Sequence, residues 1–164
     1  MNADDPQLEG LRRRASAIPL DAAQRSEWSR QFNLVPAVVH FQTSVDLADP
    51  AIVRVTLPRI DEHHVGGLRV RAVNGAVLAG LFDCALGVAG ALQFIGKRAG
   101  TCELSIKFMR AAFEAPVEAF AACVKRTSGL AFVESELYSG GRLCALATGI
   151  VAVAADRGGE EVFW

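Results

Sequence analysis

The sequence predicts an α+β fold in which a curved antiparallel sheet wraps around one long helix. Residues 74–93, NGAVLAGLFDCALGVAGALQ, are apolar on every side of a helical period, which is typical of a core helix. Beyond residue 100, apolar and polar residues alternate with a period of two, as they do in half-buried strands. Short turns make neighbouring strands antiparallel, and a single apolar helix then needs a sheet that curls around it.

Asp83 is an acidic residue in the middle of this apolar stretch. Because we expect protein on all faces of the helix, we expect Asp83 to be buried. A carboxylate that leaves water loses several kcal/mol unless it finds partners. Asp83 is therefore either a hydrogen-bonded structural residue or a residue kept there for chemistry. The pattern alone leaves both interpretations open.

The same stretch is long enough to cross a bilayer, since about 20 residues at 1.5 Å each span its hydrocarbon core. Two features favour a soluble core helix instead. Asp83 lies at the middle, and glycines thin the apolar surface at positions 75, 80, 87 and 90.

Composition favours one cytoplasmic domain. The 164 residues are 51% hydrophobic, enough for a sizeable core. Because 17 basic and 18 acidic residues are mixed along the chain, we expect neither nucleic acid nor a membrane as a partner. The N-terminus has no apolar segment of signal-peptide length. The cysteines form no C-x-x-C pair and are predicted to be buried thiols in a reducing compartment: Cys84, Cys102, Cys123 and Cys144.

Residues 1–34 are predicted to be a helical N-terminal extension, residues 35–154 the main domain, and residues 155–164 a tail. Asp21 and Gln24 have the spacing of a capping box, which predicts a surface helix over 21–32. Trp28 and Phe32 share one face of that helix, so we expect them to attach it to the sheet or to another subunit. Phe163 and Trp164 in the tail are expected to dock on a neighbour.

Two β-rich runs, 38–47 and 51–60, predict a strand pair after Pro36 ends the helical tendency. His40 is a polar residue within the first of these strands, and a solvent-facing or hydrogen-bonded role suits it better than metal binding. Residues 61–64, DEHH, are predicted to be a solvated loop, because consecutive residues on a loop cannot all point at one ion. We expect no metal site there.

Four strands follow the central helix. In the first, residues 102, 104, 106 and 108 are predicted to be buried and the residues between them exposed. Turn sequences then separate strands 117–126, 131–138 and 142–153. The predicted order along the chain is β-β-α-β-β-β-β.

These residues carry a family pattern: Asn74-Gly75 at the helix start, Asp83 with Ala85-Leu-Gly87, a strand over 101–110, and Ala147-Thr148-Gly149. The pattern, over residues 37–154, resembles the hotdog-fold acyl-CoA thioesterases of the phenylacetate-pathway (PaaI-like) type. The resemblance implies a hotdog fold whose sheets join edge to edge in a homodimer, or in a dimer of dimers. It also implies hydrolysis of acyl-CoA to free acid and CoA, with no cofactor.

The resemblance assigns roles to individual residues. Asp83 matches the helix carboxylate that acts as base or nucleophile, and Gly75 the amide that donates to the oxyanion. Thr101 matches a hydroxyl position that in some members orients the attacking water. Asn74 stands where many relatives have His, and Leu68 stands where Asn or Gln is common six residues earlier.

Alternative functions remain open. Asn74 and Leu68 suggest a non-catalytic module that binds an acyl-CoA or an acyl carrier. A hotdog dehydratase would need a catalytic His, and residues 65–164 contain none.

The spacing of the expected site residues has a consequence for assembly. Gly75 and Asp83 are eight residues apart, or about 12 Å along a helix, too far for both to touch one carbonyl. Two antiparallel helices across a two-fold axis would bring Gly75 of one chain to Asp83 of the other. We expect basic residues near strand ends to bind the CoA phosphates, above all Arg110 and Arg126. Gly87 is also expected to contact the substrate. The loop 59–72 is predicted to border the pocket.

Overall fold

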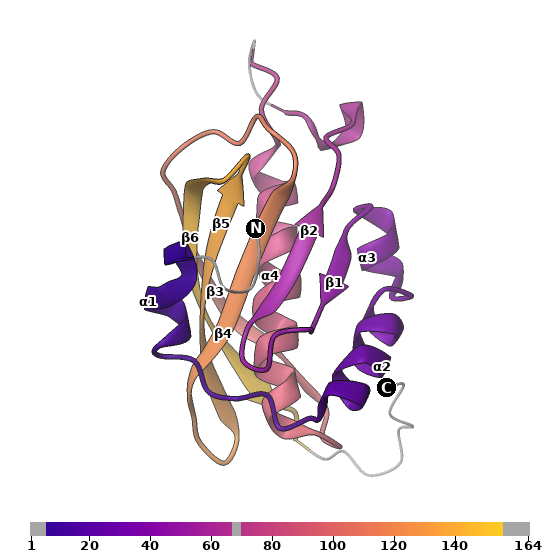
Figure 1. Cartoon of the computed structure of the whole chain (residues 1–164), viewed down its shortest axis with the longest axis vertical. Coiled ribbons are helices and arrows are strands. Elements are labelled where there is room, and N and C mark those ends of the chain that lie inside the picture. Colours follow the sequence, from indigo (N-terminus) through magenta and orange to yellow (C-terminus); the bar gives the residue numbers. More distant parts are fainter. Residues whose placement is uncertain (1–5, 67–69, 156–164) are drawn as a thin grey trace.

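A six-stranded antiparallel sheet curves around one long helix, α4, as the sequence predicts (Figure 1). The computed structural model describes residues 6–66 and 70–155. The sheet order is β1-β2-β4-β5-β6-β3, so β1 and β3 are its edges. The strands are β1 (Ser44–Asp46), β2 (Val53–Leu57), β3 (Ala99–Phe108), β4 (Val117–Arg126), β5 (Leu130–Ser139) and β6 (Arg142–Val153). The helices are α1 (Glu9–Arg12), α2 (Ala22–Phe32), α3 (Pro36–His40) and α4 (Gly75–Ala91), with short 3₁₀ turns η1 (Pro6–Leu8), η2 (Glu62–His64) and η3 (Leu92–Phe94).

The central helix α4 begins where the sequence predicts. Asn74 is its N-cap, and the Asn74 side-chain oxygen accepts a hydrogen bond of 2.8 Å from the Ala76 amide. The inner face of α4 packs on strands β2 to β6, with Leu81, Phe82 and Leu86 fully buried. The stretch Gly75–Phe94 is long and apolar enough to span a membrane, but it is the core helix around which the sheet curves.

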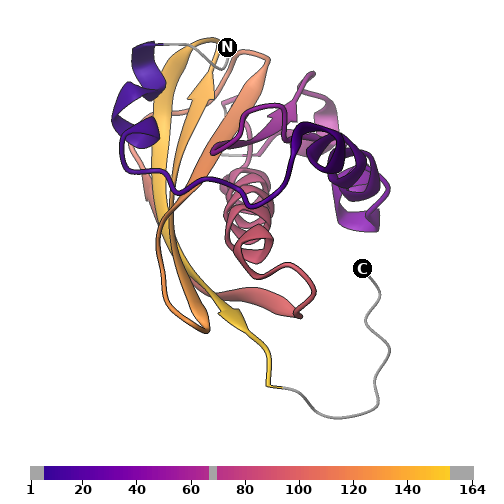
Figure 2. The same ribbon diagram turned by 60° about the horizontal axis from the view of Figure 1, so that its bottom comes forward.

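The prediction that protein surrounds α4 on every side is wrong for the single chain. Asn74, Gly75, Ala76 and Asp83 are exposed. Asn74, Gly75 and Ala76 lie at the N-terminal end of α4, whereas Asp83 lies in its middle, on a side that the sheet leaves uncovered. In Figure 2 the curved sheet and the N-terminal helices do not enclose α4 completely. Most residues on the uncovered side of α4 are small. The helix is therefore apolar all round although the sheet leaves this side open.

The N-terminal extension covers both sides of the sheet. Leu8 and Leu11, around α1, are buried against Phe120 and Tyr138 on the outer surface. Helix α2 begins at the predicted capping box and lies on the other side, near α4 (Figure 2). The rings of Trp28 and Phe32 are 5.6 Å apart, as their spacing predicts, and pack against the core of the same chain.

The strand predicted over 38–47 is largely wrong. Residues Pro36–His40 form the short helix α3, and β1 is confined to Ser44–Asp46. Pro36 begins this helix rather than ending a helical tendency, because proline at the first helical position loses no hydrogen bond. His40 accordingly lies in the last turn of α3 and not in a strand.

The strands after α4 match the prediction, and β4 and β6 have the predicted bounds. Strand β3 differs in its pattern of burial. Its register against β6 shifts between Thr101 and Glu103, so Cys102 is exposed, and Phe108 at the strand end is 53% exposed. Cys123 and Cys144 are buried as predicted, whereas Cys84 is only partly buried. The tail residues Phe163 and Trp164 lie outside the described residues.

Candidate active site

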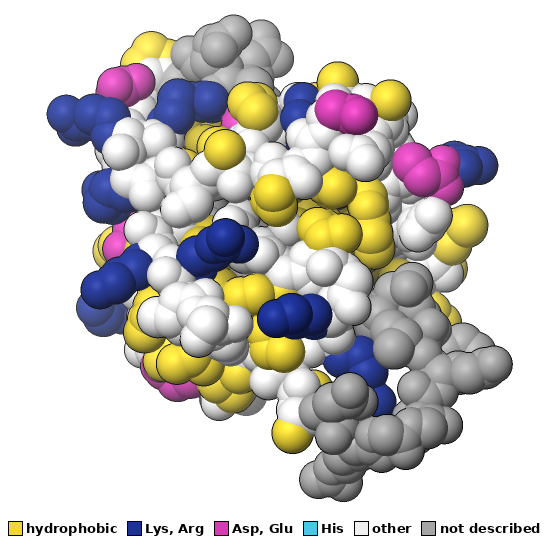
Figure 3. All heavy atoms as spheres, turned by 90° about the horizontal axis from the view of Figure 1, so that it is seen from below, with side chains coloured by type: hydrophobic (Ala, Val, Ile, Leu, Met, Phe, Trp, Pro, Cys, Tyr) yellow, Lys and Arg dark blue, Asp and Glu magenta, His cyan; other side chains and the backbone are white. Residues whose placement is uncertain are grey.

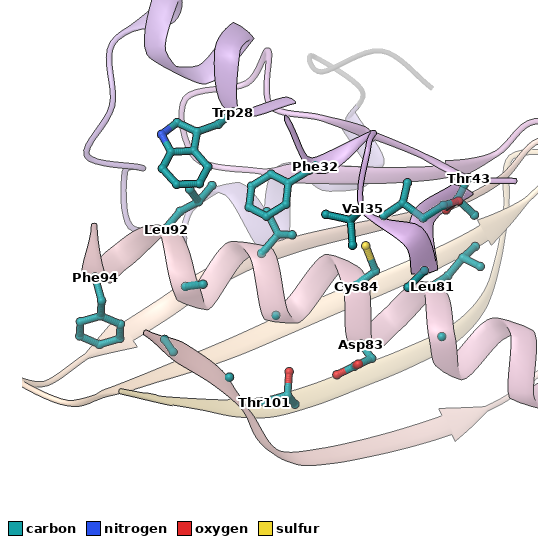
Figure 4. A pocket seen from close by; sticks show the side chains of 18 of the residues that line it. Trp28, Phe32, Val35, Thr43, Leu81, Asp83, Cys84, Leu92, Phe94 and Thr101 are labelled. Carbon is teal, nitrogen blue, oxygen red and sulfur yellow. Dashed lines mark hydrogen bonds between the residues drawn. The ribbon is translucent and has the colours of Figure 1, made fainter. Parts of the chain in front are cut away.

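A cavity of about 440 Å³ lies along the open face of α4. Its walls come from α2, α3, the turn after α4 and the first residues of β3. Asp83 and Thr101 both line it, and Figure 4 shows their side chains on the same side of α4, with Asp83 from the helix and Thr101 from β3. The structure thus brings together two of the residues predicted to be catalytic.

Gly87, predicted to lie on the substrate side, lines the same cavity one helical turn beyond Asp83. A β-carbon on Gly87 would lie 3.2 Å from the Thr101 hydroxyl oxygen. Glycine at this position therefore leaves the hydroxyl space beside the helix. A carboxylate and a hydroxyl on one wall of an apolar cavity can together hold and activate a water molecule.

Cys84 also lines the cavity but is poorly suited to act as a nucleophile. Burial, together with the negative charge of Asp83, raises the pKa of the Cys84 thiol to about 11. The thiolate is the reactive form, so Cys84 stays a neutral thiol at physiological pH. Among the groups in question, the Asp83 carboxylate and the Thr101 hydroxyl are therefore better candidates for chemistry than the Cys84 thiol.

Asn74 and Gly75, the other predicted catalytic residues, are not among the residues that line this cavity. Gly75 is the first residue of α4, where a backbone amide has no acceptor within the helix. It is exposed, and the ring of Phe108 would lie 3.7 Å from a β-carbon placed on it. Because Asp83 is eight residues further along α4, one chain does not bring the amide and the carboxylate to one point.

The two predicted phosphate-binding arginines lie near opposite ends of α4. Arg110 follows β3, and the last residue of that strand, Phe108, lies near Gly75 at the start of α4. The Arg110 side chain donates a hydrogen bond of 3.0 Å to the Leu143 carbonyl. Arg126 donates at 2.8 Å to the carbonyl of Gln93, beyond the C-terminal end of α4. At that end of the molecule, Lys and Arg side chains are spread among hydrophobic ones (Figure 3). A single chain therefore does not place Arg110 and Arg126 around one phosphate.

Residues 61–64 are only in part the solvated loop that the sequence predicts: Glu62 and His63 are exposed, but Glu62–His64 form η2, with His64 fully buried. Asp61, His63 and His64 place possible ligand atoms within 4.8 Å of one another. The argument that neighbouring residues cannot converge is thus wrong, because the 3₁₀ turn folds them together. Both ring nitrogens of His64 are nevertheless engaged: Nδ1 accepts from the Asp61 amide at 3.0 Å, and Nε2 donates to the Phe41 carbonyl at 3.1 Å. These bonds explain the burial of His64 without a metal ion.

The loop 59–72, predicted to border the pocket, contributes no described residue to the cavity lining. Leu68 is outside the described residues. The structure instead shows a wall that the sequence did not predict, made by the aromatic residues Trp28, Phe32 and Phe41. The helical spacing of Trp28 and Phe32 indicated a shared face, but their sequence did not indicate that a cavity lies beneath it.

Comparisons with known proteins agree with this fold. Residues 71–145 match the family model described as "Thioesterase superfamily". No curated protein sequence matches the chain. A Haemophilus influenzae thioesterase has 16% identity and a TM-score of 0.69, covering 82% of this chain and 91% of its own. Zebrafish thioesterase superfamily member 2 has 21% identity and a TM-score of 0.66, covering 82% of this chain and 99% of its own.

A phenylacetic acid degradation-related protein from Ralstonia eutropha is similar at 22% identity and a TM-score of 0.64, covering 77% of this chain and 98% of its own. At such identities the likeness of the solved structures shows a shared fold, and the family model adds a match in sequence over a segment in which Asn74, Gly75, Asp83 and Thr101 lie. The match supports thioester hydrolysis in general. The resemblance predicted from the sequence is confirmed: the chain has the hotdog fold and, over residues 71–145, the sequence pattern of the thioesterase superfamily.

Proposed function

We propose that this protein is a cytoplasmic, PaaI-like thioesterase that hydrolyses acyl-CoA to free acid and CoA. One observation carries the proposal: Asp83 and Thr101, from different elements, line one apolar cavity on the open face of α4. The Asp83 carboxylate acts as base or nucleophile, and the Thr101 hydroxyl orients the attacking water. The sulfur leaves with the CoA once the tetrahedral intermediate collapses.

The developing oxyanion needs a donor, and we propose the Gly75 amide of a second chain. A helix N-terminus offers unsatisfied N–H groups and a positive dipole end. Asn74 caps the helix through the Ala76 amide, so it holds the helix start without occupying the Gly75 amide. Gly75 and Asp83 lie about 12 Å apart along the helix, so one chain alone does not complete the site.

Two features support a homodimer, or a dimer of dimers, with such a shared site. Strand β3 is a sheet edge, and an open edge can pair with a second copy of the strand. Exposed apolar side chains lie at the end of β3 and just beyond it, namely Phe108, Met109 and Phe113. An isologous contact here would produce two equivalent sites.

The test is release of free CoA thiol from acyl-CoAs of short, medium, long and aryl acyl groups. Turnover with at least one of them is expected. Tight binding of acyl-CoA without thiol release from any of them would favour the non-catalytic binding module instead. Arg110 and Arg126 are compared in the same assay, because loss of a phosphate contact raises KM with little change in kcat.

A further inference from the structure

The cavity beside Asp83 continues along α4 over a floor of small residues. Gly80, Cys84, Gly87 and Ala91 recur at intervals of three or four, so they share one face of the helix, and all four line the cavity. A β-carbon on Gly80 would lie 3.1 Å from the Phe41 ring. Larger side chains on this face would fill the space, so the small residues keep it open.

The walls above this floor are almost entirely apolar. Trp28 and Phe32 come from α2, and Leu92 and Phe94 come from the turn after α4. Figure 4 shows Trp28 beside Leu92 at one end, Phe32 between, and Asp83 with Thr101 further along α4. Among the described lining residues, only Asp83 and Lys97 carry a charge. The groove is suited to a flexible apolar chain whose polar end lies at Asp83.

We propose that this groove binds the acyl chain of the substrate, with Phe32 on its wall and Trp28 at the end that sets its length. From Asp83 to Leu92 the helix advances about 13.5 Å, and an extended alkyl chain advances about 1.25 Å per carbon, which gives about ten carbons. The inference rests on the proposed function for the thioester and adds the class of acyl group, a medium-length aliphatic chain.

The groove residues that come from α2 lie outside the segment that the family model matches. Trp28 and Phe32 belong to the N-terminal extension, whereas the family model matches residues 71–145. Asp83 and Thr101 lie within that segment, and α2 supplies a wall from outside it. A compact aryl acyl group would leave the end of the groove at Trp28 and Leu92 empty.

The first arm of the test measures binding without hydrolysis. The chain has two tryptophans, so in a Trp164→Phe variant Trp28 is the sole tryptophan, and its fluorescence is excited selectively over that of Tyr138. S-alkyl-CoA thioethers of two to sixteen carbons serve as probes, since a thioether cannot be hydrolysed. We expect affinity to rise about two- to fourfold per methylene and to stop rising near ten carbons, because each buried methylene is removed from water. Equal affinities for ethyl- and decyl-CoA, with no change in Trp28 fluorescence, would overturn the inference.

The second arm changes the length of the groove. Trp28→Ala opens its far end and is expected to move the preferred acyl chain at least two carbons longer. Ala91→Leu narrows the floor near that end and is expected to reduce decyl-CoA binding at least tenfold while leaving butyl-CoA binding unchanged. Retained butyl-CoA binding shows that the variant is folded. The matched control is Leu34→Ala, an apolar truncation at a 75% exposed position outside the groove, which should leave the profile unchanged.

The two proposals fail in different ways. Chain-length-dependent thioether binding without hydrolysis of any acyl-CoA would overturn the proposed function and leave the acyl groove standing. Hydrolysis with a flat chain-length profile, or the same profile for Trp28→Ala and Leu34→Ala, would overturn the acyl groove and leave the thioesterase standing. A preference for phenylacetyl-CoA over decanoyl-CoA would also overturn the acyl groove.

Discussion

Gly87 of α4 faces Thr101 of β3 so closely that a β-carbon on Gly87 would stand 3.2 Å from the Thr101 hydroxyl oxygen. In Gly87→Ala we therefore expect the Thr101 hydroxyl to be displaced. Because the displaced hydroxyl no longer orients the attacking water, kcat should fall about tenfold. Stability should not fall, because alanine is favoured over glycine within a helix by roughly 1 kcal/mol. Turnover and urea unfolding measure the two effects separately.

The control for Gly87→Ala is the double variant with Thr101→Ser. Serine keeps the hydroxyl and lacks the methyl group, so the hydroxyl can rotate away from the added β-carbon. We expect the double variant to recover much of the lost activity. If Gly87→Ala alone turns over like the parent, the Thr101 hydroxyl does not act in the reaction.

Asn74→Ala should lower the free energy of unfolding by about 1 kcal/mol, because the side chain of Asn74 caps α4 through the Ala76 amide at 2.8 Å. Asn74→Asp keeps the acceptor oxygen and should retain most of the parental stability. Urea unfolding of the two variants checks this. Equal losses in both would show that the amide group of Asn74 acts through contacts other than the cap.

Cys84 should be slow to alkylate. Burial and the charge of Asp83 raise its pKa to about 11, so the thiolate stays a minor form until the pH approaches that value. Alkylation by iodoacetamide should therefore increase steeply between about pH 9 and 11, whereas the exposed Cys102 should react first at pH 8. Peptide mass spectrometry distinguishes the two sites. Rapid labelling of Cys84 at pH 8 would contradict the assigned burial.

The long elements could be predicted from sequence because each carries many periods of one pattern. Helix α4 and strands β4 and β6 have nearly the predicted bounds, and their antiparallel order follows from short turns. Helix α3 is not predictable in this way, because five residues are too few to show a helical period, and Val38 and Val39 favour a strand locally. Short elements depend on tertiary context.

The site was predictable only in part. The family pattern identified Asp83 and Thr101, and the structure places both at one cavity. The exposure of Asp83 could not be predicted, because hydrophobic periodicity does not show which face of a helix its own chain leaves uncovered. The wall formed by Trp28 and Phe32 depends on how the N-terminal extension folds back over α4, which no local pattern specifies.

A shared site predicts that two inactive variants restore one another. Gly75→Pro removes the proposed amide donor, and proline is well tolerated at the first position of a helix. Mixed and refolded with Asp83→Asn, it should yield hybrid dimers with one intact site, or about a quarter of parental turnover per chain. Each variant refolded alone is the control. No recovery in mixed samples shown to contain hybrid dimers would contradict a site built from two chains.

The turnover number of Asp83→Asn tests the central claim most directly. Asparagine has nearly the same shape and can still donate and accept hydrogen bonds, so a structural Asp83 would tolerate the change. A base or nucleophile cannot, and its loss should lower kcat about 10²- to 10⁴-fold with little change in KM when chemistry is limiting. Unchanged affinity for an S-alkyl-CoA thioether would show that the fold and the groove are intact. Near-parental kcat for Asp83→Asn on the best acyl-CoA would contradict the proposed role of Asp83.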